Sequence, residues 1–274
     1  MECIATLKGH TNSVFSLAHA NGLLYSGGYD GNIKVWKDLE CIATLKGHTG
    51  NILGLVYAAG LLYSGSSDNT IRVWEDFECI ATLEEHTGSI FGLTHADGLL
   101  YSGSYDRTIK VWKDFDCIAT LEGHTSGVLC IAYFNGLLYS GSSDKTIKVW
   151  EDFNCITTLK EHNNSVYYLA YADGLLYSGS IDGTIKVWKN FECVVTLEGH
   201  AVGVWCLIYA DGLLYSCSRD RTIKVWKDYK CVATLRDHNG GVLYLAYSEG
   251  LLYSGGCDGI KVWKEISAFT KRAI

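Results

Sequence analysis

Apolar and polar positions follow one pattern along the chain. In its first copy, apolar runs cover residues 14–19, 23–27, 33–36 and 41–45, and short polar segments separate them. Val, Ile, Tyr and Trp recur in these runs, and such residues favour β-strands. Asn21-Gly22 and Asp30-Gly31 lie between runs. These pairs are typical of tight hairpin turns, because both central residues of a type I′ turn need a positive φ. The pattern therefore predicts units of four short antiparallel strands.

Seven copies of this unit follow one another with a period of 38 residues. The string Gly-Leu-Leu-Tyr-Ser occurs in all seven, beginning at Gly22, Gly60, Gly98, Gly136, Gly174, Gly212 and Gly250. A cysteine, a histidine, an aspartate and a tryptophan recur with it, and only the last tryptophan, Trp263, comes one residue early. Such a repeat indicates stacked units that bury a shared core. We interpret residues 1–274 as one domain of seven repeats with a C-terminal tail at 265–274.

The second and third strands of each unit are apolar on both faces. Such strands must be covered on both sides. Stacking the sheets against one another and closing the ring provides this cover and leaves only short edges exposed. The predicted fold is all-β: a seven-bladed β-propeller with four antiparallel strands per blade.

The two chain ends are out of phase with the sheets. Residues 3–7 repeat the fourth-strand sequence, whereas the last unit, at about 242–264, has only three strands. We predict that residues 3–7 complete the last blade; the alternative is that Ile266 to Lys271 form its outer strand. One residue is also missing between Asp258 and Trp263, and we expect the turn to absorb the difference, since a slip within a strand would exchange its faces.

Two motifs connect the repeats with a known family. One is Gly-His, as in Gly9-His10, and the other runs from Ser-Gly-Ser-x-Asp to Val-Trp, as in Ser64 to Trp74. Taken sevenfold, these motifs resemble the WD40 repeat family over essentially the whole chain. Two features depart from the family pattern: Lys or Glu follows the tryptophan where the family has Asp, and Glu85, Glu161 and Asp237 replace the glycine before histidine. The resemblance implies a propeller that serves as a platform for protein interactions.

The resemblance also implies a buried network of His, Ser, Asp and Trp in each unit. Burying these polar groups without partners would be costly, and an ionised Asp facing His makes a strong charge-assisted hydrogen bond. The positions that match are His10, Ser26, Asp30 and Trp36; His48, Ser64, Asp68 and Trp74; His86, Ser102, Asp106 and Trp112; His124, Ser140, Asp144 and Trp150; His162, Ser178, Asp182 and Trp188; and His200, Ser216, Asp220 and Trp226. The shortened seventh unit is the least secure match.

Composition and charge narrow the function. The net charge is −7, which disfavours nucleic-acid binding, because that draws its affinity from Lys and Arg on phosphates. No apolar run is long enough to cross a bilayer, and the N-terminus lacks the pattern of a signal peptide. We therefore expect a cytoplasmic protein that binds neither nucleic acid nor membrane. Because a closed ring has no need to associate, we expect a monomer. The sheets fill the chain almost from end to end, so we also expect it to be part of a larger protein.

Ser, His and Asp together suggest a hydrolase, and recurring His and Cys suggest a metal. A nucleophilic site needs one exposed serine with an oxyanion hole, whereas here seven equivalent serines each have a tryptophan partner. Zinc sites use closely spaced Cys or His pairs, whereas the nearest recurring pair, Cys3 and His10, is seven residues apart. We predict no catalytic, metal or cofactor site. We interpret the periodic cysteines as small fillers of the fourth strand, and Cys130, Cys206, Cys217 and Cys257 as buried free thiols.

Function is then expected where the units differ. In the family, the top face of the propeller uses the start of the first strand and the residue before the turn Asp. The first set maps to Phe15, Leu53, Phe91, Leu129, Tyr167, Trp205 and Leu243; the second maps to Tyr29, Ser67, Tyr105, Ser143, Ile181, Arg219 and Cys257. Aromatic residues and Arg are enriched in interface hot spots, so this ring predicts a protein or peptide partner. One alternative is that several of these side chains are buried. Another is that the chain is an engineered or recently amplified propeller without a specific partner, and a third is that it is an enzyme or a small-ligand binder that uses the central channel.

Overall fold

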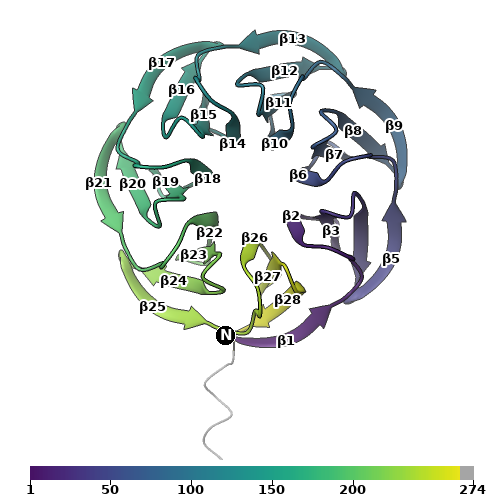
Figure 1. Ribbon diagram of the computed structural model, residues 1–274, viewed down its shortest axis with the longest axis vertical. Helices are drawn as coiled ribbons and strands as arrows, with labels where there is room; N and C mark the ends of the chain where they lie inside the picture. Colours follow the sequence, from purple (N-terminus) through teal and green to yellow (C-terminus); the bar gives the residue numbers. More distant parts are fainter. Residues whose placement is uncertain (266–274) are drawn as a thin grey trace, which may run out of the picture.

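The computed structural model describes residues 1–265, which form seven four-stranded antiparallel sheets arranged in a ring (Figure 1). Blades 1 to 3 contain β2 (Val14–Ala20), β3 (Leu23–Gly28), β4 (Ile33–Lys37) and β5 (Glu40–Leu45); β6 (Ile52–Ala58), β7 (Leu61–Ser66), β8 (Ile71–Glu75) and β9 (Glu78–Leu83); and β10 (Ile90–Ala96), β11 (Leu99–Ser104), β12 (Ile109–Lys113) and β13 (Asp116–Leu121). Blades 4 to 6 contain β14 (Val128–Phe134), β15 (Leu137–Ser142), β16 (Ile147–Glu151) and β17 (Asn154–Leu159); β18 (Val166–Ala172), β19 (Leu175–Ser180), β20 (Ile185–Lys189) and β21 (Glu192–Leu197); and β22 (Val204–Ala210), β23 (Leu213–Ser218), β24 (Ile223–Lys227) and β25 (Lys230–Leu235). Blade 7 contains β26 (Val242–Ser248), β27 (Leu251–Gly256), β28 (Gly259–Lys264) and β1 (Glu2–Leu7). The predicted fold class is confirmed.

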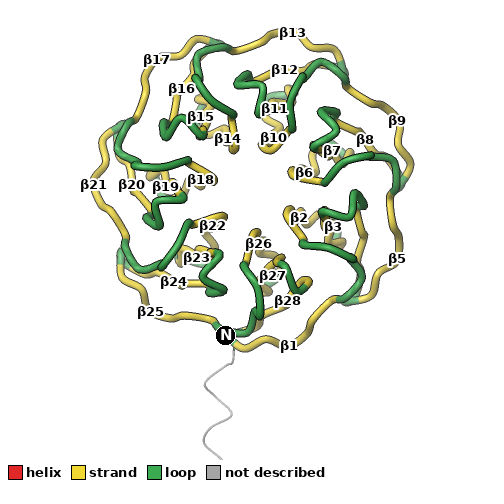
Figure 2. The backbone as a smooth tube through the Cα atoms, viewed as in Figure 1, coloured by secondary structure: helices red, strands yellow, loops and turns green. Residues whose placement is uncertain are grey.

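The turn chemistry explains where the strands end. Figure 2 shows only strands and connecting loops over the described residues. Between β2 and β3, Asn21 and Gly22 have φ of 53° and 72°, as a type I′ hairpin requires. Because the strands of each blade alternate in direction, all first-to-second and third-to-fourth turns lie on one face, which we call the bottom face. The loops that enter each blade and the second-to-third turns lie on the other, the top face.

The two chain ends close the ring in the last blade. Strand β1 pairs antiparallel with β28, with Cys3 opposite Trp263 and Leu7 opposite Ile260 (Figure 1). The prediction that the N-terminal strand completes this blade is confirmed; the alternative strand at residues 266–271 lies outside the described residues. The missing residue is absorbed by the turn, because Leu252 still faces Trp263 as Leu24 faces Trp36 in blade 1.

The hydrophobic core lies between neighbouring blades. Ile33 and Val35 of blade 1 are completely buried and belong to one cluster with Ile52, Leu62 and Trp74 of blade 2. Burying an aliphatic side chain of this size stabilises a fold by about 1.5–3 kcal/mol. A single blade would expose both of its apolar faces, so the blades are stable only as a stack.

Candidate partner-binding face

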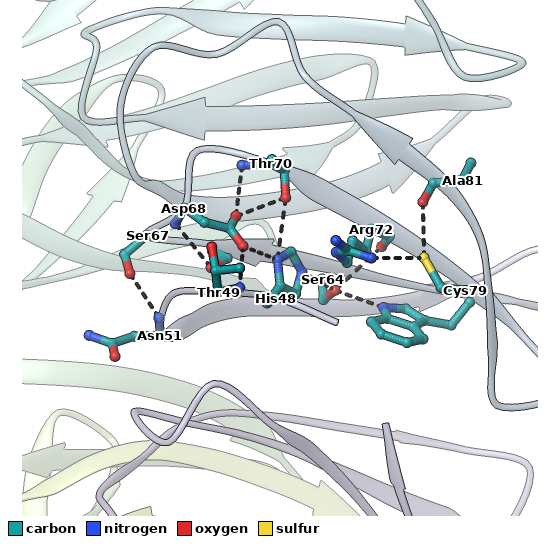
Figure 3. Close-up of polar contacts among 12 residues, drawn as sticks. His48, Thr49, Asn51, Ser64, Ser67, Asp68, Thr70, Arg72, Cys79 and Ala81 are labelled. Atoms are coloured by element: carbon teal, nitrogen blue, oxygen red, sulfur yellow. Dashed lines mark hydrogen bonds and ion pairs between the residues drawn. The ribbon is translucent and has the colours of Figure 1, made fainter. Parts of the chain in front are cut away.

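The predicted polar network is present, and blade 2 shows it clearly (Figure 3). Nδ1 of His48 lies 2.8 Å from Oδ2 of Asp68, and Nε2 of His48 lies 2.8 Å from Oγ of Ser64. Nε1 of Trp74 donates to the same Oγ at 2.8 Å. Asp68 also accepts hydrogen bonds from the backbone N–H of Thr49 and from Thr70. The network therefore ties the loop entering the blade to the turn between its second and third strands.

The pKa shifts fix the direction of these hydrogen bonds. Burial lowers the pKa of His48, against the opposing effect of Asp68, so the imidazole is neutral at pH 7. Burial alone would raise the pKa of Asp68, but hydrogen bonds from Thr70 and His48 hold it at about 2. The carboxylate is therefore ionised and accepts from Nδ1–H. Nε2 must then accept from the hydroxyl of Ser64, whose oxygen accepts from Trp74.

The same arrangement recurs around the ring. Corresponding His–Asp, His–Ser and Trp–Ser contacts of 2.6–3.0 Å occur in blades 1 and 3 to 6. In blade 7, His238 contacts Asp258 and lies 2.7 Å from Ser254, to which Trp263 donates at 2.7 Å. Blade 7 thus forms the polar network although its turn is one residue shorter. All seven serines have no exposed surface, so no substrate can reach these hydroxyls in the folded chain.

The first set of predicted top-face residues lies at β-bulges. In each innermost strand the register shifts around this position, for instance between Val14 and Ser16. A bulge leaves one residue unpaired and re-aims its side chain. The expected exposure is wrong for five of the seven: Phe15, Leu53, Leu129, Trp205 and Leu243 are at most 8 % exposed. Phe91 and Tyr167 are half-buried. Their part in partner binding stays a prediction.

These side chains pack on one another across the ring, because the bulges turn them inward. The ring of Phe15 lies edge-on to that of Trp205, with centroids 5.8 Å apart, and 6.4 Å from Phe91. Tyr167 lies 4.3 Å from Trp205. A cavity of about 90 Å³ among them is lined by all seven innermost strands. We call this cluster the aromatic plug; it gives the top face a rigid floor.

The second set is more accessible. Tyr105 is 58 % exposed, and Arg219 and Cys257 are also exposed. Tyr29, Ser67, Ser143 and Ile181 are half-buried. The guanidinium of Arg219 lies 4.5 Å from the ring centroid of Trp205, within the range of a cation–π interaction. The exposed top face is therefore a rim of variable residues that rests on the aromatic plug.

Comparisons with known proteins agree with this geometry. The family model described as "WD domain, G-beta repeat" matches residues 1–37, 39–75, 77–113, 115–151, 153–189 and 191–227. The chain belongs to the WD40 repeat family. The WD40 β-propeller domain of Doa1 is 27 % identical, with a TM-score of 0.89, and the match covers 97 % of each chain. A search of curated proteins found no match. WD40 propellers generally serve as protein-interaction scaffolds and are typically non-catalytic.

The cysteines of this WD40 chain depart from one expectation. Cys130, Cys206 and Cys217 are buried as predicted, but Cys257 is exposed, because it precedes the turn Asp on the top face, where the equivalent Tyr105 and Arg219 are exposed as well. The periodic cysteines lie on the outermost strands, where Cys41, Cys155 and Cys231 are exposed and the others half-buried. They are therefore only partial fillers. Among the described residues, no cluster of His, Cys, Asp or Glu could hold a metal, and no helix could span a membrane.

Contacts between the blades of this WD40 propeller were missed by the sequence analysis. Oη of Tyr133 donates to Asp97 of the preceding blade at 2.6 Å, and this bond raises the pKa of Tyr133 to about 12. Tyr209 and Asp173 make the same contact at 2.7 Å. The sequence does contain a signal for these contacts: a Tyr recurs 36 residues after the Asp or Asn of a bottom turn. These bonds tie neighbouring blades together on the bottom face.

Proposed function

We propose that this chain is a non-catalytic scaffold that binds a protein or peptide through the top face. The proposal is supported by two exposed residues, Tyr105 beside Phe91 and Arg219 over Trp205, which each pack on the aromatic plug. Tyr and Arg on a rigid, desolvated base are typical of interface hot spots. They also occur where the units differ, whereas the positions of the polar network are the same in every blade.

The test compares pull-downs with three baits: the unaltered chain, a Tyr105→Ser/Arg219→Ser variant, and a control with Thr82→Ala at an exposed position of the outermost strand β9. Both altered side chains of the top-face variant are exposed, so folding is expected to be retained, as circular dichroism would show. We expect partners of the unaltered chain to be lost by the top-face variant and kept by the control. If the top-face variant keeps every partner of the unaltered chain, the top-face assignment is refuted.

A second candidate is an engineered or recently amplified propeller with no specific evolved partner. The near-identity of the repeats favours it: Glu-Cys-Ile-Ala-Thr-Leu occurs in β1, β5 and β9 alike. This candidate predicts that the unaltered chain yields no partner that recurs across independent pull-downs. A reproducible partner would contradict it.

A further inference from the structure

The bottom face repeats an exposed aromatic side chain in an unfavourable backbone conformation. In the turns between third and fourth strands, the second residue is Leu39, Phe77, Phe115, Phe153, Phe191 or Tyr229, each with φ between 64° and 73°. These side chains are 39–45 % exposed. Bulky residues rarely adopt this left-handed region. The turns between first and second strands of the same blades place Gly at the corresponding position, so the fold itself does not require an aromatic residue there.

Four of the aromatic residues, Phe77, Phe115, Phe153 and Tyr229, each stand beside a groove between two blades. Four such grooves, at blade pairs 1/2, 2/3, 3/4 and 5/6, have cavity volumes of about 170, 350, 260 and 270 Å³. The groove between blades 2 and 3 is lined by Leu61, Tyr63, Leu100 and Trp112 and by Phe115, which is partly exposed. We call these four the bottom grooves. Each is large enough to take one apolar side chain.

The surroundings of the bottom grooves are strongly acidic. There are two sets of bottom turns: residues 37–40 with five equivalents, and residues 21–22 with six equivalents. Together they contain 15 acidic and five basic residues. Their net charge of −10 is more negative than the −7 of the whole chain, so the remaining residues carry a net charge of +3. Asp76, Asp114 and Asp152 line grooves that contain no Lys or Arg. Asp228 lines the groove between blades 5 and 6 together with Asp173 and Lys227. Within residues 1–265, no ion pair with Lys or Arg neutralises these four carboxylates.

From this apolar groove in an acidic rim, we infer that the bottom face binds basic peptide segments that carry an apolar anchor. The anchor enters the groove beside the aromatic residue, and flanking Lys or Arg side chains meet the turn aspartates. Arg can also stack on the aromatic ring. Charge complementarity selects this occupant over an acidic or purely apolar one. This site is separate from the proposed top-face function, and each can fail without the other.

The probe is a synthetic peptide, acetyl-Arg-Lys-Leu-Lys-Arg-amide, and its binding to the unaltered chain is measured by calorimetry. Two matched peptides replace Leu by Gly, or all four cations by Glu. We expect the Gly peptide to bind about tenfold more weakly, as the loss of one buried Leu side chain implies, and the Glu peptide not to bind. Added salt should weaken the binding of the Leu peptide, since interactions between exposed charges are screened. Equal binding of the Leu and Gly peptides, or no binding of the Leu peptide, would overturn the proposal.

The matching variant replaces Phe77, Phe115, Phe153 and Tyr229 together by Gly. Because Gly accepts a positive φ without strain, this variant should unfold at the same temperature as the unaltered chain or higher, while peptide affinity falls about tenfold or more. The Tyr105→Ser/Arg219→Ser variant is the control and should bind the peptide normally. Loss of binding in that control instead would place the peptide on the top face and refute the inference.

A second variant keeps the test valid if the glycine variant misfolds. Replacing Asp76, Asp114, Asp152 and Asp228 by Asn keeps a residue that tolerates the left-handed region. Peptide affinity should fall and become less sensitive to salt; an unchanged salt dependence would contradict the assigned role of these carboxylates. If the unaltered chain instead dimerises and the glycine variant is monomeric, the occupant is a second copy of this chain and the peptide assignment is wrong.

Discussion

Replacing Ser64 by Ala tests whether the polar network is held together by its hydroxyl. Oγ of Ser64 accepts from Trp74 and donates to His48, each at 2.8 Å. Its removal leaves an indole N–H and an imidazole nitrogen unpaired, in side chains that are almost fully buried. An unsatisfied buried polar group costs about 1–3 kcal/mol, so the free energy of unfolding should fall by roughly 2–5 kcal/mol.

The assay is urea unfolding followed by both tryptophan fluorescence and circular dichroism, since agreement of the two signals is needed to use a two-state free energy. The matched control is Thr82→Ala on the exposed side of β9, which should change stability by less than about 0.5 kcal/mol. In a Ser64→Ala/Trp74→Phe double variant, no indole N–H is left unpaired. The two single costs should therefore not add, with a coupling of about 1 kcal/mol or more. This account would be refuted if Ser64→Ala lowered the free energy of unfolding no more than the control did, and if the effects of Ser64→Ala and Trp74→Phe were additive.

Three further results are expected. The folded pKa values of Asp68 and His48 both lie below the unfolded values of 3.8 and 6.5, so the unfolded chain binds more protons at low pH. The free energy of unfolding should therefore be highest above about pH 6.5 and fall towards pH 2. Urea midpoints that stay constant over this range would contradict the assignment. Deleting residues 1–7 removes the partner of β28, so hydrogen exchange should accelerate in blade 7 and slow again when a peptide of residues 1–8 is added; no acceleration would mean that β1 does not hold the ring closed. Exposed Cys257 should react with a thiol reagent in the folded chain, whereas buried Cys217, whose pKa is raised by burial, should react only after unfolding, as mass spectrometry of the labelled peptides would show.

The sequence alone determined the architecture, because the information needed for it is local and repeated seven times. The Asn-Gly and Asp-Gly turns set the strand ends. The apolar second and third strands required cover on both faces, and the spare strand at the N-terminus matched the strand missing from the last unit. The polar network was predicted from the family motif, and even the shortened seventh unit forms it, since Trp263 keeps its place opposite Leu252.

The tertiary structure decided which side chains reach solvent. Phe15 and Trp205 start apolar strands like their equivalents, and nothing in the sequence marks the bulge that turns them into the channel. Whether such a residue is exposed depends on partners in blades far away in the sequence. The bottom grooves arise in the same way, because each combines two neighbouring blades with a turn whose positive-φ residue adds an aromatic side chain to the lining. Local pattern fixes strands and turns, whereas exposure is a property of the closed ring.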